Sequence, residues 1–181
     1  RNKNICPAES NRVPLQYIDG AENSDYINAV FVHGYLGQKY FIATQTPLPS
    51  TINDFWRLVH SQKSSAIVLL GVVKDGTSYP KFWPTKRGQP TQYGSLTVQL
   101  DSEQKSDEIW TRKFILSSYP DLSDGAVVNI FHYTKWPDHG VPPNAIGVIT
   151  LTSLVEKSRK NHGHGPIIVV CSDGAGRTGT Y

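Results

Sequence analysis

The apolar residues of this chain recur with two different periods, which predict strands and helices along its length. Short β-branched and aromatic runs bounded by glycine or proline are typical of strands, and they occur at residues 25–32, 39–44, 65–70, 94–100, 109–118, 125–133 and 166–170. Residues 51–60 are predicted to be helical because their apolar side chains fall on one face, and residues 145–160 form the last full helix. Strands interleaved with helices, some strands pairing antiparallel, predict an α/β or α+β fold with a mixed sheet.

A glycine-rich segment follows the last apolar run. It places Cys171 at the predicted strand end and Arg177 after five intervening residues, the spacing found in cysteine-dependent phosphatases. Such a loop can point successive backbone N–H groups at an anion, and a following helix would add its positive N-terminal end. Arg177 would offer a planar fork to two phosphate oxygens, and the thiolate of Cys171 would be the nucleophile. The alternative, a buried structural cysteine and a surface arginine, is disfavoured by the preceding strand and by the glycines within the loop.

A second segment that could carry chemistry contains Trp136, Pro137 and Asp138, followed by Gly140. A loop with one carboxylate beside a large apolar anchor suits a general acid that closes over a substrate. An ordinary Pro-Asp turn is the alternative. The Cys171–Arg177 segment downstream favours the general acid.

Composition narrows the class of protein. A chain of 181 residues with 38% hydrophobic and 18% charged residues predicts one globular domain. The net charge is +3, and the basic residues are not clustered in the way that indicates nucleic-acid binding. Cys6 and Cys171 lie far apart, which favours a reducing intracellular compartment over a disulfide framework. No apolar run is long enough to span a membrane, so no membrane contact is expected from this segment. His162 and His164 fit an exposed turn, and no cofactor or metal is expected.

Several blocks together resemble the protein tyrosine phosphatase family, and the resemblance covers the whole chain. The blocks are residues 25–29 (Asp-Tyr-Ile-Asn-Ala), 42–47 with 54–56, 136–138 and 171–179. Thr46 stands where the family usually has glycine. The resemblance implies a phosphatase-like fold, a highly twisted mixed sheet flanked by helices. It also implies one domain over residues 1–181, incomplete at both ends and truncated after the phosphate-binding loop.

The resemblance assigns roles to individual residues. Cys171 attacks phosphorus, Arg177 binds the phosphoryl oxygens, and Asp138 protonates the leaving phenolate and later acts as a base. The loop residues that bind the phosphate are Ser172, Asp173, Gly174, Ala175, Gly176, Arg177 and Thr178, and the Thr178 hydroxyl would hydrogen-bond the Cys171 sulfur. The implied substrates are tyrosine-phosphorylated proteins.

Four departures from the family pattern bear on activity. Val170 stands where a histidine normally orients the loop and favours the thiolate. Asp173 replaces an alanine, and its carboxylate would oppose both thiolate and phosphate if it points into the loop. Asn2 and Asn4 stand where a tyrosine normally stacks on the substrate ring and an aspartate normally holds the peptide.

A fifth departure concerns the loop at residues 74–83, where the family glutamate is not evident and Asp75 is a candidate substitute. The departures resemble the second, membrane-distal domains of receptor-type phosphatases. The string 171–181 also resembles the islet-autoantigen receptor-like phosphatases, which lack the acid-loop aspartate that this chain keeps.

Two functions therefore remain open. One is an active tyrosine phosphatase of weak activity; the other is a pseudophosphatase domain that regulates another phosphatase domain or binds a phosphoprotein. A Cys-x5-Arg enzyme acting on another oxyanion is disfavoured by the blocks between residues 25 and 56. In either case the expected location is cytoplasmic, including the intracellular part of a membrane receptor.

Overall fold

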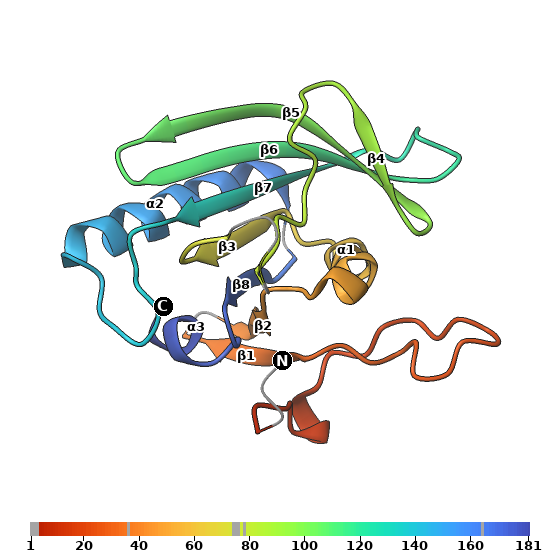
Figure 1. The fold of residues 1–181 in the computed structure, drawn as a ribbon, viewed down its shortest axis with the longest axis horizontal. Coiled ribbons are helices and arrows are strands. Elements are labelled where there is room, and N and C mark those ends of the chain that lie inside the picture. The colour runs from red at the N-terminus through yellow and green to blue at the C-terminus, as the bar shows by residue number, and fades with distance from the viewer. Residues whose placement is uncertain (1–3, 36, 74–76, 78, 164) are drawn as a thin grey trace.

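The computed structural model describes residues 4–35, 37–73, 77, 79–163 and 165–181. Their strands form one mixed eight-stranded sheet in the order β1-β2-β8-β3-β7-β6-β5-β4 (Figure 1). The strands are β1 (Ala29–Gly34), β2 (Gly37–Gln45), β3 (Ala66–Leu70), β4 (Pro90–Tyr93), β5 (Leu96–Ser106), β6 (Ile109–Ser118), β7 (Ala126–Tyr133) and β8 (Ile167–Cys171). The mixed sheet predicted from the sequence is confirmed.

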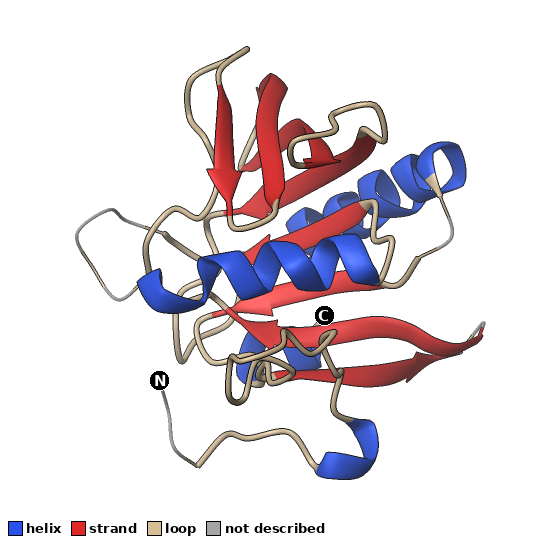
Figure 2. Ribbon diagram, turned by 90° about the vertical axis from the view of Figure 1, so that its right-hand side faces the viewer, coloured by secondary structure: helices blue, strands red, loops and turns tan. Residues whose placement is uncertain are grey.

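Helices cover both faces of this sheet (Figures 1 and 2). They are α1 (Ile52–Ser61), α2 (Ala145–His162) and α3 (Gly176–Thr180), with 3-10 turns η1 (Glu9–Asn11) and η2 (Pro49–Thr51). On one face, Phe55 and Trp56 of α1 belong to the larger buried apolar cluster. On the other, Leu151 and Val155 of α2 belong to a second cluster. The sheet is thus the middle layer of three.

The strand that leads to the predicted phosphate loop lies near the middle of the sheet. β8 pairs parallel with β2 on one side and with β3 on the other. Its side chains alternate between the two cores, since Val170 joins the α1 side while Val169 and Cys171 join the α2 side. All five residues of β8 are buried. The loop after Cys171 therefore starts from one of the most constrained points of the fold.

Three expectations differ most from the structure: the start of the first strand, the end of the strand expected at residues 94–100, which continues as β5 to Ser106, and the edge strand β4, which was not expected. The first strand begins at Ala29 rather than at residue 25, because the Asp25 carbonyl accepts hydrogen bonds from Leu15 N and from Arg12 Nη1 instead of joining the ladder. The sequence gives no clear signal for β4, because its four residues show no apolar alternation and three of them are exposed at the sheet edge. β6, in contrast, has the predicted bounds.

Candidate active site

The loop after β8 is fixed to the end of β2. The Cys171 carbonyl accepts hydrogen bonds from both Thr46 N (2.7 Å) and Thr46 Oγ1 (3.0 Å). Gly174 has a φ of +77°, and a Cβ there would lie 2.6 Å from Gln45 N. Only glycine satisfies both the left-handed backbone and this close approach. The loop is therefore held against β2, with the Cys171 side chain 1% exposed.

Asp173 fills part of the anion site that the loop forms. Its Oδ1 accepts the backbone N–H of Ala175 (3.0 Å) and of Gly176 (3.2 Å), and also a hydrogen bond from Cys171 Sγ (3.3 Å). Partial burial alone would raise the pKa of this carboxyl, but the hydrogen bonds from Ala175, Cys171 and Gly176 together hold its pKa below the usual value. The loop amides do converge on an anion, and here that anion belongs to the chain itself.

Arg177 connects this loop to the predicted acid loop. Its Nη1 donates to the Trp136 carbonyl (3.0 Å), and its Nη2 donates to Asp138 Oδ1 (3.0 Å). The same Nη2 donates to Ser172 Oγ (2.9 Å). The guanidinium is 8% exposed, while the Asp138 side chain is 43% exposed. Arg177 Nε is buried and has no hydrogen-bond partner among the described residues, so these residues leave one donor of the fork unused.

The acid loop lies folded over this arginine. Trp136 is buried, and its Nε1 donates to the Gly140 carbonyl (3.0 Å), which closes the loop on itself. Ser172 Oγ donates to Asp138 Oδ1 (3.0 Å), so this carboxylate has two partners at the mouth of the site. Cavities of about 410 Å³ and about 340 Å³ border the site, and Trp136, Asp138 and Arg177 line both. Both cavities can hold an oxyanion beside an arginine and a carboxylate, whereas the buried Cys171 lines neither of them.

Comparison with known proteins shows the family of the chain. The family model described as protein-tyrosine phosphatase matches residues 1–181. The chain belongs to the protein-tyrosine phosphatase family. It is 40% identical over 98% of its length to mouse receptor-type tyrosine-protein phosphatase epsilon and 36% identical over 98% to human receptor-type tyrosine-protein phosphatase alpha. It is 40% identical over 100% of its length to mouse receptor-type tyrosine-protein phosphatase eta. It spans 26%, 22% and 14% of these three curated relatives.

The other residues that the phosphatase resemblance assigned to substrate lie in different places. Thr178 is buried, but its Oγ1 has no hydrogen-bond partner among the described residues, so the contact with the Cys171 sulfur is not formed. Asn4 is exposed and lines neither of the two cavities beside Arg177. Asn2 and Asp75 lie outside the described residues.

Three residues near the phosphatase site were not identified from the sequence. Thr46 was noted only as a departure, and its hydroxyl proves to bind the Cys171 carbonyl. Gly71 follows β3 and packs against Arg177. His132 is one of two polar residues in the mostly apolar strand β7, the other being Asn129, and its presence there is the signal that the sequence offers. Burial lowers the pKa of His132 to about 4, so the ring is neutral at physiological pH.

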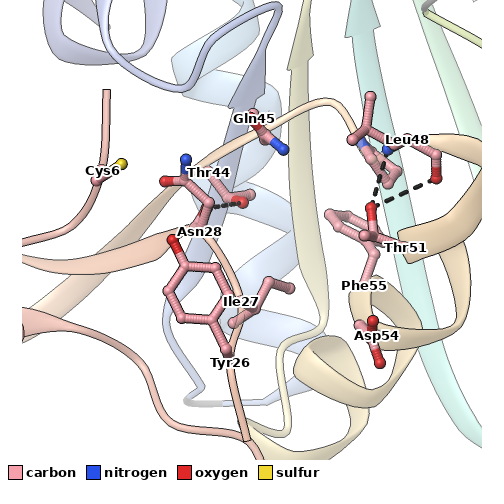
Figure 3. A pocket seen from close by; sticks show the side chains of 11 residues that line it. Cys6, Tyr26, Ile27, Asn28, Thr44, Gln45, Leu48, Thr51, Asp54 and Phe55 are labelled. Atoms are coloured by element: carbon pink, nitrogen blue, oxygen red, sulfur yellow. Dashed lines mark hydrogen bonds between the residues drawn. The ribbon is translucent and has the colours of Figure 1, made fainter. Parts of the chain in front are cut away.

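A further cavity of about 260 Å³ lies between the N-terminal segment and α1 (Figure 3). Figure 3 shows Tyr26 and Asn28 along one wall, Leu48 and Phe55 along the other, and Cys6 at the edge. Asn28 Nδ2 already donates to the Ile5 carbonyl (2.8 Å). None of the residues assigned a role in phosphate chemistry lines this cavity.

No helix in the described part of the chain is long and apolar enough to cross a membrane. Among the same residues, no group of three His, Cys, Asp or Glu side chains is placed to hold a metal ion.

Proposed function

We propose that this domain hydrolyses phosphotyrosine through a cysteinyl-phosphate intermediate, with turnover reduced by Asp173. The observation that supports this most strongly is the placement of Arg177. Arg177 lies in the phosphate loop, and its guanidinium donates hydrogen bonds to Trp136 and Asp138 of the acid loop. Its buried Nε has no partner among the described residues. This donor suits an oxygen of a bound phosphoryl group.

In this mechanism the Cys171 thiolate attacks phosphorus, and the bond from phosphorus to the phenolic oxygen breaks. The proton for that oxygen comes from Asp138, and Arg177 and the loop amides bind the equatorial oxygens. A water molecule then attacks phosphorus, gives a proton to Asp138, and breaks the sulfur–phosphorus bond. The products are the phenol, inorganic phosphate and the restored thiolate.

A binding module with little or no turnover is the second candidate. The observation that favours it is the Asp173 carboxylate, which accepts two loop N–H groups and the thiol hydrogen. A phosphate dianion needs the same donors and meets a negative charge beside them. Val170 adds to this, because it packs in the apolar core and offers no hydrogen bond to the loop.

The relatives suggest the setting of this site. Because they are receptor-type tyrosine-protein phosphatases, we propose tyrosine-phosphorylated proteins as substrates and the cytoplasmic side of a membrane receptor as the location. Asp173 and Val170 favour a role like that of a second phosphatase domain, with another phosphatase domain as a partner.

Hydrolysis of p-nitrophenyl phosphate by the domain that contains these 181 residues tests the proposal. Cys171→Ser should abolish release of p-nitrophenol, while the matched control Cys6→Ser should retain it, since Cys6 is exposed and lies outside the site. Turnover that persists in Cys171→Ser would rule out this nucleophile. Absence of turnover in the unmodified chain and in Asp173→Ala alike would favour the binding module.

A further inference from the structure

The guanidinium of Arg177 rests on the backbone of Gly71. Gly71 directly follows β3 and has a φ of +102°. A Cβ at this position would overlap Arg177 Nη1 and lie 2.8 Å from its Cζ. The absent side chain is therefore what allows the arginine to occupy its place, and the position of this backbone sets the position of the guanidinium.

Two hydrogen bonds fix Gly71 to the end of β7. Its N–H donates to the Tyr133 carbonyl (2.9 Å), and its carbonyl lies 2.7 Å from His132 Nε2. A carbonyl can only accept, so His132 must carry its hydrogen on Nε2. The neutral ring then presents Nδ1 as an acceptor, 3.4 Å from Arg112 Nη1.

Arg112 is itself held from several sides. Its Nε donates to Glu103 (3.1 Å), and its guanidinium lies 5.1 Å from the ring centre of Trp83 and 4.8 Å from that of Trp110. These contacts fix the position of Arg112 Nη1, the group from which His132 Nδ1 accepts a hydrogen bond. They also place a permanent positive charge beside the ring, which with burial keeps the ring neutral.

The segment that follows β7 also contacts Arg177 directly. Three residues beyond Tyr133, the Trp136 carbonyl accepts from Arg177 Nη1 (3.0 Å). Arg177 is thus held by the acid loop, through the Trp136 carbonyl and Asp138 Oδ1, and it also packs on Gly71, whose carbonyl lies within hydrogen-bond distance of His132.

We propose that His132 is a positioning residue for the phosphate-binding arginine: its Nε2–H fixes the Gly71 carbonyl, and Gly71 sets the surface on which the Arg177 guanidinium lies. The proposal rests on the proposed function in one respect, that Arg177 binds the phosphoryl oxygens. Without the imidazole, the buried Gly71 carbonyl and Arg112 Nη1 both lose a partner, and the turn after β3 is free to shift.

The test compares two substitutions of this histidine. His132→Gln keeps an N–H donor within reach of the Gly71 carbonyl, whereas His132→Leu fills similar space without one. Affinity for inorganic phosphate, measured by calorimetry, should fall about tenfold or more in His132→Leu and by less than about threefold in His132→Gln. The kcat for p-nitrophenyl phosphate should follow the same order.

Tyr133→Phe is the matched control. It removes the hydrogen bond from Tyr133 Oη to Glu108 (3.2 Å) on the adjacent residue of β7 and leaves the backbone contact with Gly71 in place. It should lower the melting temperature without changing phosphate affinity. An equal loss of affinity in Tyr133→Phe and His132→Leu, or no rescue in His132→Gln, would overturn the proposal.

A second readout keeps the proposal separate from the proposed function. The Nε–H resonance of Arg177 in a ¹⁵N spectrum, assigned by its loss in Arg177→Lys, reports the order of this side chain without any ligand. It should stay sharp in His132→Gln and broaden in His132→Leu and in Gly71→Ala. If the unmodified chain binds no phosphate, the proposed function fails, and this resonance still decides the role of His132. A resonance that is unchanged in both His132→Leu and Gly71→Ala would refute that role.

Discussion

The thiol of Cys171 donates a hydrogen bond to the carboxylate of Asp173, with Sγ 3.3 Å from Oδ1. The candidate nucleophile thus forms a hydrogen bond with a side chain of the very loop that is expected to activate it. The same oxygen accepts hydrogen bonds from the N–H groups of Ala175 and Gly176, so one side chain occupies both the thiol hydrogen and two of the loop amides.

Asp173→Ala should increase phosphate affinity and phosphatase rate. It frees two loop N–H groups and removes a negative charge, and a gain of about tenfold corresponds to about 1.4 kcal/mol. The rate of alkylation of Cys171 by iodoacetamide should rise as well, because the thiol loses its hydrogen bond to the Asp173 carboxylate.

Asp173→Asn separates the two effects of this side chain. The amide keeps an oxygen that can accept the loop N–H groups but carries no charge. If phosphate affinity and rate increase in Asp173→Ala alone, the inhibition comes from the side chain occupying the loop N–H groups. If they increase equally in both variants, it comes from the negative charge. If neither variant changes alkylation, affinity or rate, Asp173 does not limit this site.

Asp138→Ala should slow the reaction by a factor on the order of 10²–10⁴, as expected for loss of a positioned proton donor. The loss should be larger for phenyl phosphate than for p-nitrophenyl phosphate, since the nitrophenolate leaves readily without a proton. Steady-state rates with both substrates and calorimetry with inorganic phosphate provide the measurement. A loss that appears in phosphate affinity alone would assign Asp138 to holding Arg177 instead.

Stability should decrease with acidification because of His132. Burial lowers the pKa of this ring to about 4, the bond to the Gly71 carbonyl opposes the shift, and the charge of Arg112 adds to it. An unfolded histidine titrates near pH 6.5, so the unfolded state takes up the proton first as the pH falls. The contribution of His132 to the free energy of unfolding is complete above about pH 6.5. It is lost as the pH falls towards about pH 4, to a total of about 3 kcal/mol.

Urea unfolding between about pH 7 and about pH 5 measures this dependence, because most carboxyl groups remain ionised in that range. His132→Gln should flatten the curve, whatever its stability at neutral pH. Parallel curves for the unmodified chain and for His132→Gln would show that the ring does not titrate differently on folding.

Val170→His should destabilise the domain by about 1–3 kcal/mol, because it buries a polar ring at a core position without a prepared partner. Val170 is 0% exposed and belongs to the apolar cluster on the α1 side of the sheet. Chemical denaturation measures the loss. Iodoacetamide alkylation of the same variant shows separately whether the new ring favours the thiolate, as the family histidine is expected to do. A fully stable variant would mean that the core rearranges to pair the imidazole.

The strand, loop and helix that form the phosphate site could be predicted from the sequence because their signals are local. A β-branched run, three glycines and an arginine lie within fifteen residues, and the structure places them as β8, a tight loop and α3. The helix at residues 51–60 was predicted for the same reason, and α1 differs from it by one residue at each end.

Contacts that depend on the sheet order could not be predicted in this way. Gly71 and His132 are distant in sequence and meet only because β3 and β7 are parallel neighbours. The sequence shows that Asp173 is present, but only the folded loop shows that its carboxylate turns towards Cys171 and the N–H groups of Ala175 and Gly176. The Thr178 hydroxyl is the opposite case: the family motif predicted a hydrogen bond to the Cys171 sulfur, and the structure does not form it.

The position of β8 has a consequence for how the domain is made. β2 and β3 are synthesised early, yet each remains without one neighbour until residues 167–171 insert between them. A nascent chain that ends before this strand therefore exposes two unpaired parallel edges and is a natural client of chaperones. The strand that completes the sheet also carries the thiol.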